Sequence, residues 1–138
     1  MFGNFSNPVS AYRSVNVDSS VASADPHQLI MLLFDGALAA IALARGEMDR
    51  RNIAAKGKSI SKAIDIIENG LKASLNMEAG GDLSEKLDGL YDYMILRLLQ
   101  ANLKNDVSAL DEVAGLLGEI QGAWVGIRPQ VITPPTSG

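Results

Sequence analysis

The sequence predicts an all-α protein, an up-down-up-down antiparallel four-helix bundle with an extended N-terminal segment. Apolar residues recur at helical spacing in four stretches, and no stretch shows the two-residue alternation of a β-strand. The breaks between these stretches span roughly 2–8 residues, and connections this short place consecutive helices antiparallel. We expect the extended segment at residues 1–24, the bundle at residues 25–127 and a disordered, proline-rich tail at residues 128–138.

The first helix is expected over residues 26–50. Asp25 can accept a hydrogen bond from a first-turn N–H group, and Pro26 suits the first helical position because the N–H that proline lacks would have no helical partner there. Between residues 29 and 44 the only charged residue is Asp35. A bundle helix needs only one apolar stripe, so this helix carries more apolar surface than a core requires.

Caps and chain breaks delimit the other three helices. The second is expected to follow Asn52 and to run to residue 75. The pair Gly80-Gly81 should break the chain before the third helix, for which Asp82 is the cap. The short turn Asn105-Asp106 separates the third helix from the fourth.

The surplus apolar residues on the first and third helices predict a hydrophobic groove for a partner helix. An alternative is that these residues contact the N-terminal segment or widen the core. Both hold together if the N-terminal segment covers the groove until a partner displaces it. Side chains that point away from the main stripes, together with one tyrosine of the N-terminal segment, are the candidate partner-binding residues: Tyr12, Met31, Leu38, Tyr93, Leu96, Leu99 and Leu103.

Composition excludes several functions. The chain has no cysteine and one histidine, which excludes disulfides, thiolate metal sites and two-histidine metal sites. A net charge of −4 argues against binding to nucleic acid or anionic membranes. No signal peptide is visible, and the longest apolar run is shorter than the roughly 20 residues of a membrane span. We therefore expect a cytoplasmic protein with no cofactor, no nucleic acid partner and no membrane insertion.

No catalytic set can be assembled, so the protein is not expected to be an enzyme. His27 lies in the first turn of its helix and is expected to be solvent-exposed. Asp35 is expected to bond a nearby lysine, tyrosine or backbone amide. A histidine phosphotransfer bundle is an alternative, since Lys56-Gly57 would suit it, but it requires an exposed mid-helix histidine that the chain lacks. A generic helical interaction module is a further alternative.

Several groups of residues, in order and at matching spacing, resemble one protein family. They are ADPHQLI at residues 24–30 with LFDGA at 33–37, KAI-x-II at 62–67 with Gly70-Leu71, Gly80-Gly81, LY-x-YM at 90–94 with Arg97-Leu98 and Ala101-Asn102, and Asp106 with Glu112-Val113, Leu116-Leu117 and Ala123-Trp124. Together they resemble the flagellar secretion chaperone family FliS, over residues 10–127. Tyr12 occupies the place of the family's N-terminal tyrosine. Asp25 stands where the family usually has serine, which is an equally good helix cap.

This resemblance implies a four-helix bundle that acts as a cytoplasmic, ATP-independent chaperone. Members of the family bind the disordered C-terminal region of newly made flagellin, prevent premature polymerisation and help to deliver the subunit to the flagellar type III export apparatus. The implied partners are therefore flagellin and the export apparatus. The apolar surplus would then offer grooves to flagellin segments that become helical on binding.

Overall fold

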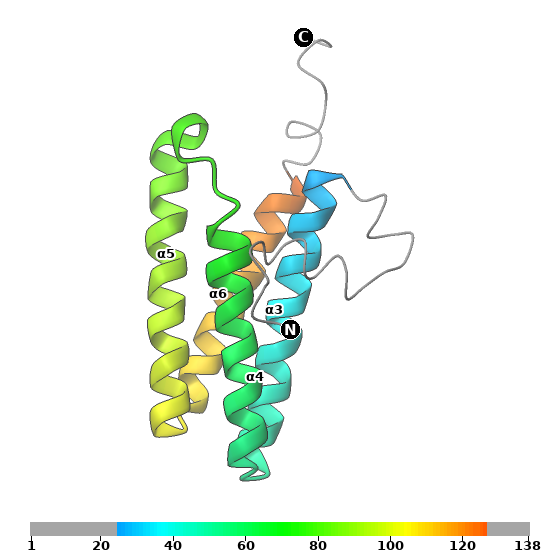
Figure 1. Ribbon diagram of the computed structural model, residues 1–138, viewed down its shortest axis with the longest axis vertical. Coiled ribbons are helices and arrows are strands. Elements are labelled where there is room, and N and C mark those ends of the chain that lie inside the picture. Colours follow the sequence, from blue (N-terminus) through cyan, green and yellow to red (C-terminus); the bar gives the residue numbers. More distant parts are fainter. Residues whose placement is uncertain (1–24, 127–138) are drawn as a thin grey trace, which may run out of the picture.

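The computed structural model describes residues 25–126, which form an antiparallel four-helix bundle (Figure 1). The elements in chain order are α3 at Pro26–Asp49, α4 at Ile53–Asp65, the π-helical segment η2 at Ile66–Lys72, α5 at Met77–Lys104 and α6 at Val107–Gly126. The segment η2 continues α4, so the two form one rod. The predicted all-α, up-down-up-down bundle is confirmed, and residues 1–24 and 127–138 lie outside the described part of the chain.

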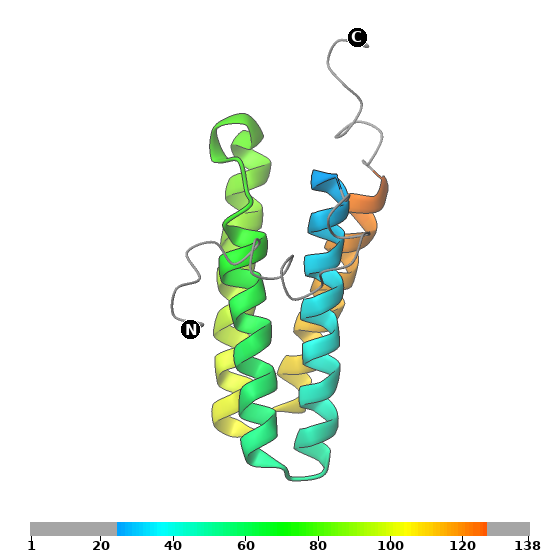
Figure 2. The same cartoon turned by 45° about the vertical axis from the view of Figure 1, so that its right-hand side comes forward.

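The four rods close into a ring. Each rod packs against the next one in the chain, and α6 returns to pack against α3. The turned view of Figure 2 shows α6 beside α3, and α5 beside the rod of α4 and η2. The first and last helices of the described chain are therefore neighbours, and this proximity builds contacts between residues almost 100 positions apart.

The start of α3 follows the predicted cap. The backbone N–H of Gln28 donates to Asp25 Oδ1 over 2.8 Å, and Pro26 occupies the first turn. The helix ends at Asp49, one residue earlier than expected. Arg51, two residues further on, has a φ of 59° and turns the chain toward α4.

The second rod departs from the prediction of one continuous α-helix. Its last seven residues, Ile66–Lys72, have the wider i to i+5 turns of a π-helix. Gly70 in this segment faces α3 so closely that a Cβ atom on it would lie 3.0 Å from Leu33 Cδ2. The wider turns and the missing side chain bring the two backbones together, a tertiary arrangement that apolar spacing does not reveal.

The double glycine breaks helix geometry at the predicted place. Helical hydrogen bonding begins at Met77, but Gly81 has φ 54° and ψ −129°, values outside the helical region. The regular part of α5 therefore starts after Gly81, next to the expected cap at Asp82. Glycine suits this position because it adopts positive φ without steric cost.

The core runs the length of the bundle and uses one face of every helix. Its largest fully buried apolar side chains are Phe34, Ile60, Ile67, Leu71, Met94, Leu98, Leu110 and Leu117. By length and composition alone α3 could cross a membrane, but here it packs as a bundle helix with Phe34, Ala37 and Ile41 buried. The side chains left outside this core form the surfaces considered next.

Candidate protein-binding surfaces

The outer face of α5 carries the apolar line expected from the sequence. Leu96, Leu99 and Leu103, here named the outer leucine line, are 52%, 51% and 81% exposed. They lie three and four residues apart and so share one helix face. Contiguous apolar residues this exposed are typical of interaction sites.

Tyr93 extends this line toward α6 and is held in place by polar contacts. Its hydroxyl donates to Glu112 Oε2 over 2.6 Å, and Arg97 Nε donates to Glu112 Oε1 over 2.7 Å. The hydrogen bonds from Tyr93 and Arg97 lower the pKa of Glu112, and the bond to Glu112 raises the pKa of Tyr93. The ring, 41% exposed, therefore presents a fixed edge to a partner.

The candidate residues of α3 are less exposed than those of α5. Met31 and Leu38 are both half-buried, and Leu38 packs against the core. The outer surface of α3 instead exposes Leu32 and Leu43, by 40% and 58%. The sequence did not predict these two residues, because the helix is apolar on all sides and its pattern does not show which side faces the solvent. Tyr12, the remaining candidate, lies outside the described residues.

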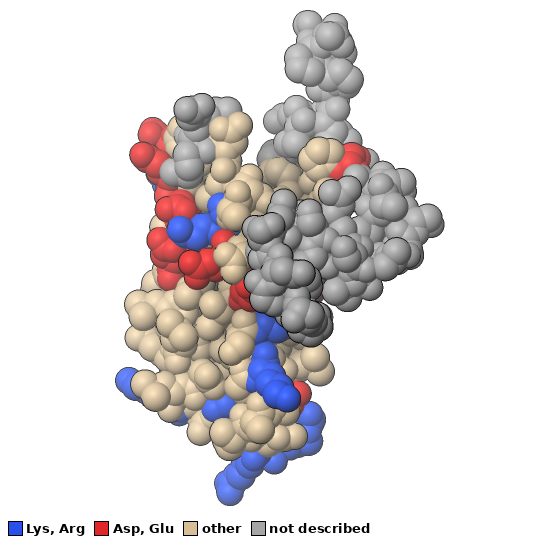
Figure 3. Space-filling model, in the orientation of Figure 1, with Lys and Arg blue, Asp and Glu red and all other residues tan. Residues whose placement is uncertain are grey.

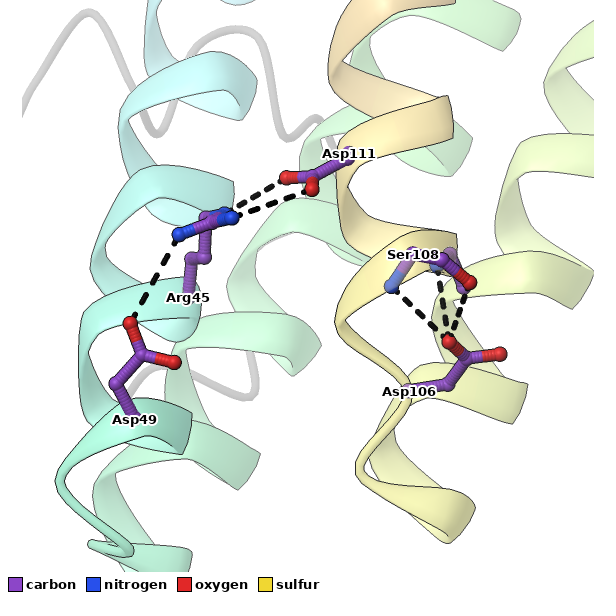
Figure 4. Close-up of polar contacts among 6 residues, drawn as sticks. Arg45, Asp49, Asp106, Ser108 and Asp111 are labelled. Atoms are coloured by element: carbon purple, nitrogen blue, oxygen red, sulfur yellow. Dashed lines mark hydrogen bonds and ion pairs between the residues drawn. The ribbon is translucent and has the colours of Figure 1, made fainter.

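Polar pairs close the seam between α3 and the lower part of α6 (Figure 4). Arg45 Nε donates to Asp111 Oδ1 over 2.7 Å, and a second guanidinium nitrogen lies 3.8 Å from Asp49. The hydrogen bond from Arg45 lowers the pKa of Asp111. Further along the seam, Gln121 Nε2 donates to Asp35, which is exposed. Asp35 thus accepts from a side-chain amide. The prediction of a lysine, tyrosine or backbone partner is wrong for this contact.

At the opposite end of the bundle the four rods leave a cavity of about 530 Å³, which we name the end cavity. Leu83, 62% exposed, lies at its edge. The walls come from α3, η2, α5, α6 and the segment before α5, and they include Ile30, Phe34, Leu71, Leu75, Leu87, Tyr91, Ile120 and Trp124. This second apolar surface forms only where four helix ends meet, so no stretch of sequence contains it.

One wall of the end cavity rests on an interlocked pair, His27 and Trp124, which we name the clasp. Their rings stack with centroids 5.0 Å apart and an interplanar angle of 6°. His27 Nε2 lies 2.8 Å from the Trp124 carbonyl oxygen, and Trp124 Nε1 donates to the His27 carbonyl over 3.2 Å. His27 is only 2% exposed, so the prediction of a solvent-exposed histidine is wrong. The two rings meet because α6 packs against α3, which brings the first turn of α3 against the last turn of α6.

These features define a class: a closed four-helix bundle with apolar surfaces of the kind that bind protein segments. The family model described as "Flagellar protein FliS" matches residues 8–131 of the chain. The chain therefore belongs to the FliS family, and the resemblance drawn from its motifs is confirmed.

Relatives from several bacteria support the same assignment. The flagellar secretion chaperone FliS of Salmonella typhimurium is 54% identical over 122 residues, which cover 88% of this chain and 90% of the relative. FliSB of Pseudomonas aeruginosa is 50% identical over 116 residues, covering 84% and 91%. FliS of Escherichia coli is 48% identical over 127 residues, covering 91% and 93%. The family to which the chain belongs is thus one of chaperones and not of enzymes.

Proposed function

We propose that this protein is a cytoplasmic chaperone of flagellar type III export. It binds the disordered C-terminal region of flagellin, prevents premature polymerisation and assists delivery to the export apparatus. The observation that carries the proposal is the outer leucine line, whose side chains are 51% to 81% exposed on a protein of a flagellar chaperone family.

A flagellin segment that folds into a helix on α5 would place its own apolar side chains between these leucines. Such helix-in-groove binding uses anchors at i, i+3, i+4 and i+7, the same spacing as the line itself. Tyr93, fixed by Glu112, would border the docked helix on the α6 side. Since binding buries apolar surface and orders a disordered segment, we expect a clearly negative heat-capacity change.

The N-terminal segment with Tyr12 enters this proposal as a cover for apolar surface. A tethered segment has a high effective concentration at its own bundle, so weak contacts suffice to shield the surface. When flagellin displaces it, hydrogen exchange should speed up at residues 12–20 and slow down along the outer leucine line. Unchanged exchange at residues 12–20 would contradict this part of the proposal.

The histidine phosphotransfer alternative has no support in the structure. It needs an exposed histidine in the middle of a helix, and the single histidine of the chain is His27. That side chain is buried in the first turn of α3 and bonded to Trp124.

The decisive experiment is calorimetric titration with a peptide from the C-terminal end of flagellin, on the wild type and on Leu96→Ala/Leu99→Ala. Each leucine is about half exposed. Docking would bury this exposed half, which contributes about 1 kcal/mol per leucine to the binding free energy. Loss of both should weaken binding about 30-fold. Val125→Ala, which truncates an equally exposed apolar residue of α6, is the matched control and should bind like the wild type.

Thermal unfolding of the same variants separates binding from folding. The double variant should melt near the wild type, whereas Leu98→Ala, which truncates a fully buried leucine, should cost about 2–5 kcal/mol. If the double variant binds the peptide as tightly as the wild type, the outer leucine line is not the flagellin site. If it melts like Leu98→Ala, these leucines are packing residues.

A further inference from the structure

Charge is separated along the bundle in a way that the net charge of −4 conceals. In Figure 3 most Asp and Glu side chains gather over the upper part of α5, and most Lys and Arg side chains lie toward the opposite end. That end holds the α3–α4 and α5–α6 turns. Its exposed bases are Arg50, Arg51, Lys58 and Lys104, which we name the basic end.

The bases of this end have no acidic partner within the described residues. Among the described residues, every ion pair involves Arg45, Lys72 or Arg97, and none of these three bases belongs to the basic end. The two carboxylates nearest the turns are engaged elsewhere: Asp49 faces Arg45, and Asp106 accepts a hydrogen bond from Ser108 Oγ over 2.6 Å. The four exposed bases therefore offer their charge to solvent or to a partner.

A buried lysine adds to the positive potential at this end. Lys56 is 2% exposed, and its Nζ donates to the Asn102 carbonyl over 2.9 Å and to Asn105 Oδ1 over 2.6 Å. Both acceptors are neutral, so they satisfy the ammonium group without cancelling its charge. The end of the bundle thus has positive charge beneath its surface as well as on it.

The backbone at Arg51 gives an independent indication that its side chain matters. The N–H of Arg51 bonds the Met48 carbonyl over 3.1 Å and the N–H of Asn52 bonds the Glu47 carbonyl over 2.8 Å, the two bonds of a Schellman motif. The residue at this position has positive φ and is usually glycine or asparagine. Asn105 fills the matching position after α5, with φ 53°, whereas Arg51 has φ 59°. An arginine at this position is therefore uncommon, and the strained backbone makes its side chain a candidate for a function.

Beside Arg51 the two turns enclose a partly apolar hollow. It measures about 520 Å³ and is lined by Met48, Asp49, Arg51, Ile53, Asn105 and Val107. Ile53 is 55% exposed, and isoleucine is one of the residues most often found buried. The hollow combines an apolar wall from Met48, Ile53 and Val107 with the polar side chains of Arg51, Asn105 and Asp49. The Asp49 carboxylate is paired with Arg45.

We propose that the basic end is a second docking surface, which binds an acidic segment of a partner protein. An apolar side chain of that segment enters the hollow beside Ile53, and flanking carboxylates pair with Arg50, Arg51 and Lys104. Charge complementarity is the argument for the occupant: the exposed bases of this end have no carboxylate partner among the described residues, and the hollow beside Arg51 has room for apolar side chains. The basic end adjoins Leu103 at Lys104, but none of the outer leucines and not Tyr93 lines its hollow, so the inference goes beyond the proposed flagellin site.

A protein segment fits better than a membrane or RNA. A flat lipid surface would leave the hollow unfilled, and the two turns contribute no aromatic side chain on which bases could stack. The acidic patch on α5 and the overall negative charge also repel an extended polyanion. A short acidic segment reaches only the basic end, because screening at physiological salt limits repulsion to about 8 Å.

The test uses the full-length chain and a short fluorescein-labelled peptide that alternates Glu, Asp and Leu, followed by fluorescence anisotropy at physiological salt. The peptide should bind, and Arg50→Glu/Arg51→Glu should weaken it at least about tenfold. Lys86→Glu, an exposed base on the upper part of α5, is the matched control and should leave the affinity unchanged. Amide NMR shifts on binding should concentrate at residues 51–53 and 105–107.

Two further comparisons make the result decisive. Arg51→Gly removes the charge while favouring the native turn, so weaker peptide binding by this variant cannot be attributed to unfolding. The proposal is wrong if both Arg51 variants bind like the wild type, or if a peptide with Gln and Asn in place of its acids binds equally well. It is also wrong if phosphatidylglycerol vesicles or a single-stranded RNA bind this end more tightly than the acidic peptide does.

Discussion

The clasp between His27 and Trp124 should make a large contribution to the stability of the bundle, and His27→Ala tests this. The substitution removes a hydrogen bond of 2.8 Å and a ring stack with a 5.0 Å centroid separation from a side chain that is 2% exposed. The hydrogen bond contributes about 1 kcal/mol, the stack about 1 kcal/mol and the lost apolar burial about 1 kcal/mol. We expect a loss of about 3 kcal/mol, or about 15 °C in melting temperature for a domain of this size.

Urea unfolding followed by tryptophan fluorescence measures this loss directly, because Trp124 is the single tryptophan of the chain. Folded His27→Ala should also emit at longer wavelength than the wild type, since the indole loses its stacked neighbour. Gln28→Ala, in the same turn but exposed, should stay within about 0.5 kcal/mol of the wild type. Trp124→Phe keeps an aromatic ring but removes the Nε1 donor, and should cost about 1 kcal/mol from that bond. Because this variant has no tryptophan, its urea unfolding is followed by circular dichroism.

The reasoning would be refuted by a His27→Ala variant that unfolds at the same urea concentration as Gln28→Ala. An unchanged emission maximum would show that the indole does not depend on the stacked ring. Because Trp124 also lines the end cavity, either result would mean that the two outer helices are held at this end by other contacts.

Three further substitutions test separate features of the fold. Arg51→Gly should raise the free energy of unfolding by about 1 kcal/mol, because glycine adopts the φ of 59° without steric cost; a lower urea midpoint would show that the arginine side chain stabilises the turn. Burial raises the pKa of Tyr91 from 10.0 to about 12, so the folded state holds the phenol proton more tightly. That stabilisation is complete below pH 10 and falls by roughly 2–3 kcal/mol as the pH rises to 12. Tyr91→Phe should lose less stability than the wild type over this range, and parallel pH profiles would contradict the assignment. Lys56→Met removes the donor shared by the Asn102 carbonyl and Asn105. It should lower the free energy of unfolding in urea by about 2 kcal/mol. Equal stability would mean that the desolvation free energy of the buried ammonium group cancels the free energy of its two hydrogen bonds.

Local rules were sufficient to predict the bundle. Caps at Asp25 and Asn52 accept the hydrogen bonds that helix starts require, and Gly81 breaks helix geometry where the double glycine indicated. The outer leucine line could also be predicted, because three exposed residues on one helix follow from periodicity along that helix alone. Each of these features depends on residues only a few positions apart.

The features that were missed or mispredicted depend on which helices become neighbours. His27 is buried because ring closure places Trp124, 97 residues away, against its ring. The π-helical turns at Ile66–Lys72 accompany the close approach of Gly70 to Leu33, which spacing along one helix does not encode.

The same reason divides the features that follow from pattern along the chain from those that arise only when the helices pack together. Helix number, helix order and the exposed face of α5 follow from short-range pattern. The end cavity and the basic end do not, because each gathers side chains from helices or turns far apart in the chain. Arg51 and Lys104 lie at one end of the molecule only because two antiparallel hairpins align their turns. The net charge of the chain does not show where its charges lie, so it could not predict this basic end.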